Sequence, residues 1–229
     1  MSTQPAPAPR VARVFLVDMD NTLSDNDAIK RDLQYTVVDL LGRGHGNRFW
    51  ALYESVREEH DYVDFPGTIE RFHLEHPHEH RLDQITDLLW NLPFAKYLYP
   101  GALDTVAALQ TLGTVVVLTD GDAWYQPRKL ARSGVTAAVE GRVLIYRHKE
   151  KSLPDVEVRY PADQYVLVED KPSILAAAKR VLRAEITTVL VQQGQYATSA
   201  ALPDIHPAPD LVAPTIADVG RQARAWFGG

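Results

Sequence analysis

The stretch that decides the fold is VFLVDMDNTL, residues 14–23. It opens with four apolar residues, a pattern typical of a short strand that is buried in a parallel sheet. Two carboxylates one residue apart, Asp18 and Asp20, end this strand. Because unpaired carboxylates at the edge of a core are costly, a hard divalent cation is the expected occupant between them. The alternative interpretation is a polar turn that only starts the next helix.

Composition narrows the classes of function. The chain has 229 residues, 45% of them hydrophobic, which is enough for one core or for one core with an inserted lobe. Its net charge of -6 argues against nucleic acid as a partner. The chain has no cysteine, which excludes thiol catalysis and thiolate metal sites within it. No stretch approaches the ~20 apolar residues of a membrane span, so we expect no membrane partner and a cytoplasmic location.

The pattern along the chain predicts three parts. Residues 1–10 are rich in Pro and Ala, and we expect them to be a disordered leader. Apolar residues at helical spacing predict a lobe of four helices over residues 24–97, with breaks at residues 42–44 and 64–67. Strands and helices alternate after residue 98, so residues 11–23 and 98–229 are predicted to form an α/β core with a Rossmann-like parallel sheet. The four further strands are expected at residues 114–118, 142–146, 165–168 and 187–191.

Polar side chains follow the later strands as well. Thr119 and Asp120 follow the second strand, Lys149 lies just after the third, and Glu169 and Asp170 follow the fourth. Because the carboxyl ends of parallel strands meet at one edge of a sheet, we expect these groups to join the two aspartates of the first strand. The hydroxyl of Thr119 and the helix start after it suit a phosphate oxygen, with Asp120 beside them in the substrate-binding turn. Lys149 would place a positive charge against the same phosphate.

These charges indicate a reaction at phosphorus. Asp18 can act as a nucleophile, since carboxylates form covalent phospho-intermediates. Asp20 can protonate the leaving oxygen and then deprotonate water. We expect Asp18, Asp20 and Asp170 to bind Mg²⁺, which is usually held by few carboxylates together with substrate phosphate. The expected substrate is a small phosphorylated metabolite.

A family resemblance supports this interpretation. Residues 18–22, DMDNT, match the DxDxT signature of the haloacid dehalogenase (HAD) superfamily of phosphohydrolases. Thr119, Lys149 and the pair Glu169–Asp170 resemble its three later motifs, and the helical insertion stands where the family carries a cap. The resemblance implies the HAD fold, a nucleophilic first aspartate that also binds Mg²⁺, and a second aspartate that is the acid–base group and binds Mg²⁺ through its main-chain carbonyl.

Two assignments stay open within the motifs. The fourth motif reads Glu169–Asp170 where Gly-Asp or Asp-Asp is common, so either acid can be the metal ligand. The third motif has Lys149 and Lys151 as candidates, and Lys129 lies on the helix after the second motif. We prefer Lys149 because it lies closest to the end of the third strand.

The alternative functions are a dehalogenase, a phosphomutase and a catalytically idle regulatory module. A dehalogenase of the same superfamily lacks an acid–base aspartate two positions after the nucleophile, so Asp20 argues against it. The intact set of acids argues against an idle module, whereas the sequence leaves the phosphomutase open.

Two groups in the helical insertion have a functional and a structural interpretation. A histidine-rich stretch over residues 73–80 can bind a transition metal or be a solvated connection. Four aromatic residues can line a substrate pocket or belong to the hydrophobic core. They are Trp50, Tyr53, Phe72 and Trp90.

Overall fold

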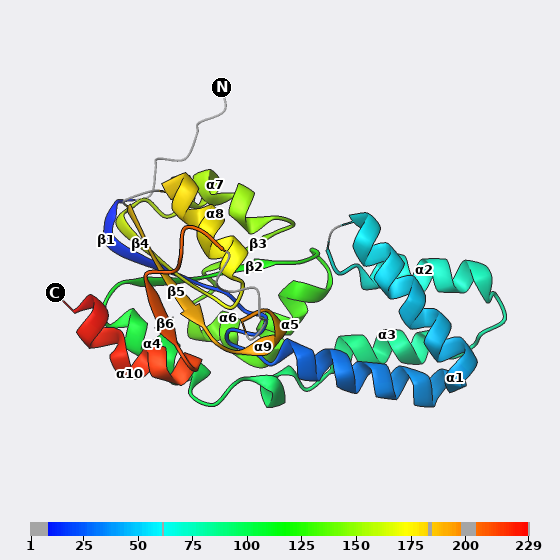
Figure 1. Ribbon diagram of the computed structural model, residues 1–229. Helices are drawn as coiled ribbons and strands as arrows, with labels where there is room; N and C mark the ends of the chain where they lie inside the picture. Colours follow the sequence, from blue (N-terminus) through cyan, green and yellow to red (C-terminus); the bar gives the residue numbers. More distant parts are fainter. Residues whose placement is uncertain (1–8, 61, 183–184, 198–204, 229) are drawn as a thin grey trace, which may run out of the picture.

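The structure, a computed structural model, describes residues 9–60, 62–182, 185–197 and 205–228. It consists of a parallel sheet with helices on both faces and a group of helices beside the carboxyl edge of the sheet (Figure 1). The predicted α/β class with a Rossmann-like parallel sheet is confirmed. Most of the expected leader, residues 1–8, lies outside the described residues.

The sheet has six strands in the order β3-β2-β1-β4-β5-β6, and all neighbours are parallel. Five of them correspond to the predicted strands. The sixth was not predicted, because three residues are too short to show a periodic pattern. The strands are β1 (Val11–Val17), β2 (Thr114–Asp120), β3 (Val143–Tyr146), β4 (Ala162–Glu169), β5 (Ile186–Val191) and β6 (Leu211–Ala213).

The molecule has three layers at this point, helices, sheet and helices, and β1 is a central strand of the sheet. Phe15 and Val17 face one hydrophobic cluster, and Val14 and Leu16 face the other, because side chains alternate along a strand. Helices cover both faces, so every position of the strand from Val14 onward is buried. The helices of the first face are α4 (Ala102–Gln110), α6 (Val135–Ala138) and α10 (Ile216–Phe227), and those of the second are α7 (Leu153–Arg159) and α8 (Pro172–Leu182).

The register of the sheet aligns the ends of the strands. Val17 is paired both with Val117 of β2 and with Val168 of β4. The amide of Asp18 then donates to the carbonyl of Val168 over 3.0 Å. The strand order changes direction between β1 and β4, and open α/β sheets bind ligands at such a point. The residues that follow β1, β2 and β4 therefore meet at one place.

The helical region, residues 26–97, has a hydrophobic cluster of its own. The first two predicted helices form one helix with a kink at Gly42, whose φ of 77° lies in the region that favours glycine. None of the described helices has the length and apolar character needed to cross a membrane. The elements of the region are α1 (Asn26–His60), α2 (Phe65–Glu75), α3 (Leu82–Asn91) and the 3₁₀ turn η1 (Phe94–Tyr97).

Helix α5 (Tyr125–Ser133), which follows β2, joins the helical region to the sheet. Tyr125 belongs to the cluster of the helical region, with its ring centroid 4.8 Å from that of Phe65. Arg128 lies 4.4 Å above the ring of Trp90 and donates to its carbonyl over 3.0 Å. Leu130 of the same helix packs in a cluster under the sheet. A displacement of the helical region would therefore shift or strain α5 through these contacts.

The loop after β1 is held by a close contact with α9 (Gly194–Ala197). Asn21 has a φ of 62°, and its Oδ1 accepts from the amides of Asn26 and Asp27 over 3.0 and 3.2 Å at the start of α1. A Cβ atom on Gly194, whose φ is +70°, would lie 2.5 Å from the Cβ and Cγ of Asn21. The contact requires a glycine at this position.

We expect Gly194→Ala to lower the free energy of unfolding by about 1–3 kcal/mol, because it adds backbone strain and displaces a helix cap. Gly44→Ala is the matched control, since nothing lies within 4 Å of that position on α1. It should stabilise by about 0.5–1 kcal/mol. Urea unfolding of both variants measures the difference, and equal stabilities would contradict the packing argument.

Candidate active site

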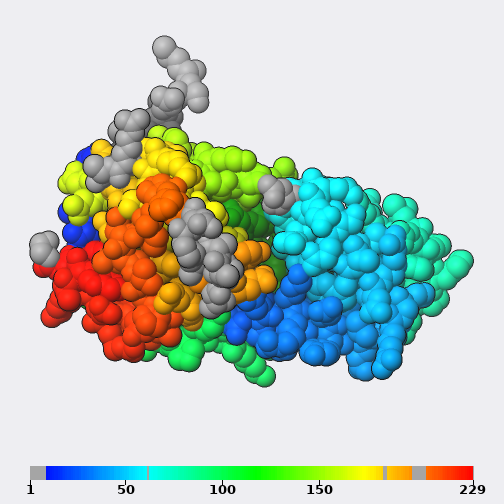
Figure 2. Space-filling model, viewed as in Figure 1, coloured from blue at the N-terminus to red at the C-terminus, as the bar shows by residue number. Residues whose placement is uncertain are grey.

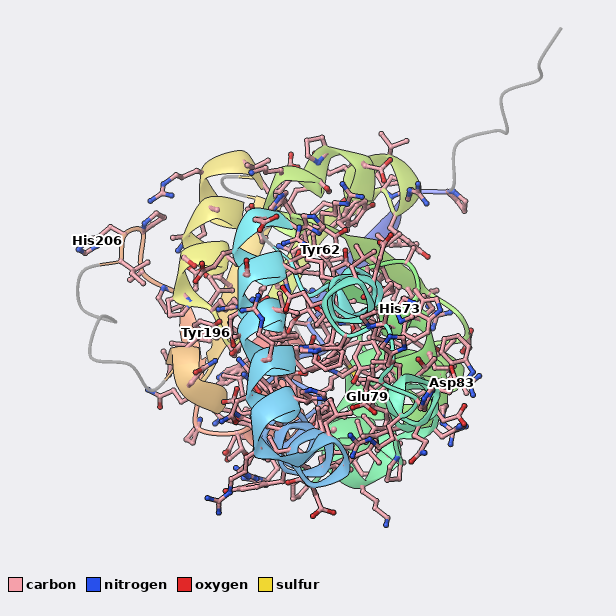
Figure 3. All side chains as sticks on the ribbon, turned by 90° about the vertical axis from the view of Figure 1, so that its right-hand side faces the viewer. Tyr62, His73, Glu79, Asp83, Tyr196 and His206 are labelled. Atoms are coloured by element: carbon pink, nitrogen blue, oxygen red, sulfur yellow. The ribbon has the colours of Figure 1, made fainter. Side chains whose placement is uncertain are left out.

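A cavity of about 710 Å³ lies between the carboxyl edge of the sheet and the helical region. Figure 2 shows a hollow with recessed green atoms between the blue and cyan helices and the yellow and orange part of the sheet region. Its walls include Asp20 and Asp120 on the sheet side and Tyr53 on α1. Tyr62 and Tyr196 also line it, and Figure 3 shows them on opposite sides of α1.

Asp18 and Lys149 form a buried ion pair at the base of the site. Asp18 is 3% exposed and Lys149 is 1% exposed. The Lys149 ammonium donates to Oδ1 of Asp18 and lies 2.5 Å from Oε2 of Glu169. Burial alone would lower the pKa of Lys149, but the two carboxylates raise it well above its usual value. The ammonium therefore stays charged and neutralises part of the acidic cluster.

Asp120 fixes the segment that carries this lysine. Its Oδ1 accepts from the backbone amide of Lys149 over 2.8 Å, and its side chain also lines the cavity. Lys151, the competing lysine of the third motif, is exposed. The structure thus brings Lys149 to Asp18 and leaves Lys151 at the surface.

Three buried acids are close enough to hold a cation. One carboxylate oxygen from each of Asp18, Glu169 and Asp170 lies within 4.8 Å of the others. Neither oxygen of Asp170, nor Oδ2 of Asp18, has a hydrogen-bond partner among the described residues. Burial and the neighbouring Glu169 raise the pKa of Asp170 to about 10 and that of Asp18 to about 7. Buried oxygens without partners and mutually repelling carboxylates suit a hard divalent cation.

This cluster differs in one member from the predicted ligand set of Asp18, Asp20 and Asp170. Glu169 belongs to the cluster, while the side chain of Asp20 does not. Glu169 also makes hydrogen bonds of its own, since its Oε1 accepts from the backbone amides of Asp170 and Lys171 over 3.1 and 3.0 Å. Asp170 is therefore the acid whose oxygens are available to a cation.

Asp20 is bound by two side chains of α5: Gln126, which sequence reasoning did not identify, and Lys129, which it noted but did not prefer as the catalytic lysine. Lys129 pairs with its Oδ1, and the amide of Gln126 donates to its Oδ2 over 2.9 Å. Burial alone would raise the pKa of Asp20, but Lys129 and Gln126 lower it below its usual value. The signal in the sequence was a pair of polar residues three positions apart on one face of the helix that follows the second motif.

Thr119 joins the same network. It is buried, and its Oγ1 accepts from the Gln126 amide over 2.9 Å. Gln126 thus contacts both the residue at the end of β2 and the carboxylate that follows β1. The tips of β1, β2 and β4, with the loop after β3, form one continuous polar site.

The other candidate residues lie elsewhere. His76 packs against the ring of His45 with centroids 4.3 Å apart, whereas His73, His78 and His80 are exposed. Among the described residues, Asp18, Glu169 and Asp170 are the group of side chains placed to hold a metal ion, and the histidines form no such group. His73 lies in the last turn of α2, and His76, His78 and His80 lie in the connection between α2 and α3.

Of the four aromatic candidates, one lines the cavity. Tyr53 is a wall residue, while Trp50 and Phe72 belong to the cluster of the helical region. Trp90 lies against Trp124, with ring centroids 4.7 Å apart. The aromatic spacing thus reflects mainly core packing.

The buried ion pair gives a stability prediction. We expect Lys149→Met to lower the free energy of unfolding by about 3–5 kcal/mol, since it leaves buried carboxylates without their cation. Lys151→Met removes the same charge from the surface and should change it by less than about 0.5 kcal/mol. Thermal unfolding of the two variants measures the contrast, and similar melting temperatures would show that Lys149 does not hold the cluster.

Comparison with solved structures identifies relatives of this fold. The chain is similar to a haloacid dehalogenase-like hydrolase from Burkholderia xenovorans, at 42% sequence identity and a TM-score of 0.88, with 94% of this chain and 98% of that chain covered. No protein-family model matches the chain, and no curated protein matches it.

Two more distant structures share the fold alone. One is the L-2-haloacid dehalogenase from Xanthobacter autotrophicus with chloropropionic acid covalently bound, at 19% identity and a TM-score of 0.57, covering 93% of this chain and 98% of that chain. The other is the HAD-hydrolase YfnB from Bacillus subtilis bound to magnesium, at 14% identity and a TM-score of 0.63, covering 96% of this chain and 100% of that chain.

Proposed function

The chain belongs to the haloacid dehalogenase-like hydrolases, and we propose that it is a Mg²⁺-dependent phosphatase that acts on a small phosphorylated metabolite. The observation that carries this proposal is the second aspartate, Asp20, which lines the cavity two residues after the buried nucleophile candidate Asp18. An alkoxide leaving group needs a proton, whereas a halide does not. A carboxylate held beside the reacting centre therefore favours a phosphate ester over a carbon–halogen bond.

The proposed phosphatase reaction uses Asp18 as the nucleophile and Asp20 as the acid–base group. A carboxylate oxygen of Asp18 attacks phosphorus, and the bond between phosphorus and the leaving oxygen breaks as Asp20 gives that oxygen a proton. Asp20 then takes a proton from water, the water oxygen attacks the same phosphorus, and the bond to Asp18 breaks. Free phosphate leaves, and Asp18 is again a carboxylate.

The neighbouring groups stabilise charge during both steps. The Lys149 ammonium, already bound to Asp18, lies where negative charge develops on the transferring group. Thr119, one residue before the end of β2, would offer its hydroxyl to a phosphate oxygen. Asp18 and Asp170 would hold Mg²⁺, together with the main-chain carbonyl of Asp20. The cation would supply positive charge that offsets the carboxylates and the phosphate.

The helical region is proposed to act as a cap that selects the substrate. Tyr53 of α1 lines the cavity, and Arg147, after β3, lies 5.1 Å from the ring of Tyr62 across the opening. A cap in this position excludes water from the reacting phosphate and contacts the leaving group.

We expect Tyr53→Leu to change the ranking of phosphate esters by roughly 10-fold or more in kcat/KM, because one pocket contact is typically worth about 1–3 kcal/mol. Tyr35→Leu on the same helix is the control, since Tyr35 is 71% exposed. A panel of phosphorylated metabolites assayed with both variants measures the ranking. An unchanged ranking in Tyr53→Leu would show that this wall does not select the substrate.

The proposed function is tested by assaying phosphate ester hydrolysis and dehalogenation in parallel. The wild-type protein is assayed on p-nitrophenyl phosphate and alkyl phosphates, and separately on 2-chloropropionate, with Mg²⁺ and with excess chelator. Phosphate release that requires Mg²⁺, without halide release, supports the phosphatase. Halide release without phosphatase activity would establish a dehalogenase, and conversion of an added sugar phosphate to its positional isomer without release of phosphate would establish a phosphomutase. No activity in any arm would favour the regulatory module.

A further inference from the structure

Both oxygens of Asp20 are bound by side chains of one helix. Lys129 contacts Oδ1, and the Gln126 amide contacts Oδ2. The two residues lie three positions apart on α5, which places them on the same face of the helix. A carboxylate oxygen has more than one lone pair, so each oxygen keeps capacity for a proton beyond these contacts.

Lys129 has no part in the proposed reaction, yet it is buried to 1% exposure. Lysines are rarely buried so completely unless they are paired, because the ammonium loses its hydration. Its Nζ contacts the carboxylate of Asp20 and Oδ1 of Asn26 over 2.7 Å. Lys129 thus connects Asp20 with the first residue of α1, where the helical region begins.

Two other side chains of α5, Tyr125 and Arg128, pack against the helical region. Tyr125 contacts Phe65 and Phe94, with ring centroids 4.8 and 5.6 Å apart. Arg128 stacks on Trp90 at the end of α3. One face of α5 therefore packs against the helical region, and another face binds the carboxylate of Asp20.

We propose that Lys129 and Gln126 are positioning residues, which hold the carboxylate of Asp20 in the orientation for proton transfer. This inference rests on the proposed phosphatase function, in which Asp20 is the acid–base group. The side chain of Asp20 is 29% exposed at the cavity wall, so packing alone does not fix its rotamer. Proton transfer depends on this orientation, and a misplacement of about 1 Å can cost about 100-fold in rate.

The test compares Lys129→Met with Lys151→Met on a series of phosphate esters. Methionine keeps the length and apolar stem of the buried lysine but removes the charge. We expect Lys129→Met to lower kcat on alkyl phosphates by about 100-fold. The first turnover of p-nitrophenyl phosphate should fall less than about 10-fold, because that leaving group needs no proton. Lys151→Met should match the wild type on both.

The leaving-group dependence separates positioning from a loss of structure. A misfolded or loosened site lowers both rates equally, whereas a displaced Asp20 steepens the dependence of rate on the leaving-group pKa. Gln126→Glu, which keeps the shape but places a carboxylate against Asp20, should steepen it as well. A dependence equal to that of the wild type in both folded variants would overturn the proposal.

Different results would contradict the positioning role of Lys129 and Gln126 and the proposed phosphatase function. If the wild type hydrolyses no phosphate ester, the proposed function is wrong, and the orientation of Asp20 is then read from crystal structures of the wild type and Lys129→Met. The same Asp20 rotamer in both structures would overturn the positioning role. If the wild type is active and its leaving-group dependence is unchanged by either variant, only the positioning role is wrong.

Discussion

Asp18→Asn is expected to abolish turnover of every phosphate ester, while Asp20→Asn leaves one slow reaction with an activated aryl ester. Loss of a catalytic nucleophile costs on the order of 10⁴–10⁶-fold in rate. Asparagine has the size of aspartate and can still accept from Lys149, so the variant should stay folded. It also removes one charge from the cluster of Asp18, Glu169 and Asp170, which reduces the repulsion among these acids.

Asp20→Asn should lower alkyl phosphate hydrolysis by about 10²–10⁴-fold, the usual contribution of general acid–base catalysis. An aryl phosphate loses its leaving group without a proton, so Asp18 can still be phosphorylated. Hydrolysis of that intermediate needs the base, and the phosphorylated protein should therefore accumulate.

Mass spectrometry of Asp20→Asn after brief exposure to p-nitrophenyl phosphate measures this difference. A phosphate adduct on Asp18, with a burst of one nitrophenol per chain, is the expected result. Asp18→Asn treated in the same way should show no adduct and no burst. An adduct on another residue, or steady turnover by Asp18→Asn, would overturn the assignment of the nucleophile.

Mg²⁺ is expected to raise the melting temperature of the wild-type protein by about 5–10 °C at a hundredfold excess over its Kd. Binding at that excess stabilises the folded state by about 2.7 kcal/mol. For a chain of this size, each kcal/mol corresponds to roughly 2–4 °C. The physical source is the buried group of Asp18, Glu169 and Asp170, whose repulsion the cation relieves. Chelation should remove both the shift and the activity, and full turnover in excess chelator would reject the metal role.

Asp170→Asn should weaken Mg²⁺ binding more than Glu169→Gln does. Both oxygens of Asp170 lack hydrogen-bond partners among the residues described. Glu169 already contacts two backbone amides and Lys149. We expect a loss of about 100-fold in affinity for Asp170→Asn and about 10-fold for Glu169→Gln, the latter within the range of residues that orient a ligand.

Titration of the melting temperature with Mg²⁺ ranks the two variants. Asp163→Asn is a control for the loss of one acid, because the Asp163 side chain is 66% exposed and pairs with Arg10 at the surface. Its response to Mg²⁺ should equal that of the wild type. The reverse order of the two site variants would assign the metal to Glu169.

Much of the fold could be predicted from local pattern. The apolar run of β1 stops at Asp18, and the runs of β2 and β4 stop in the same way at Thr119–Asp120 and Glu169–Asp170. A buried strand that ends in charge is visible in the sequence, because burial and polarity are properties of each residue. Parallel pairing then requires the strand ends to meet. The chemistry of the site followed from this placement.

Local sequence pattern did not predict the side-chain contacts that form between segments far apart in the chain. Gln126 and Lys129 look like ordinary polar positions on a surface helix, and only the packing of α5 turns them toward Asp20. Lys129 and Asp20 are 109 positions apart in the chain. No periodicity predicts such a pair, because it depends on how α5 is rotated between the sheet and the helical region.

Sequence pattern alone predicted five of the six strands, the helical insertion and the residue types at the strand ends, since these follow from hydrophobic periodicity and from the alignment of parallel strands. The tertiary structure alone decided what each charged group contacts. Among the described residues it leaves the oxygens of Asp170 without a hydrogen-bond partner, pairs Glu169 with Lys149, and pairs Asp20 with Lys129. The reason is that the pairing of buried charges depends on distances of a few ångströms between side chains from different elements, which are fixed only when the elements pack together.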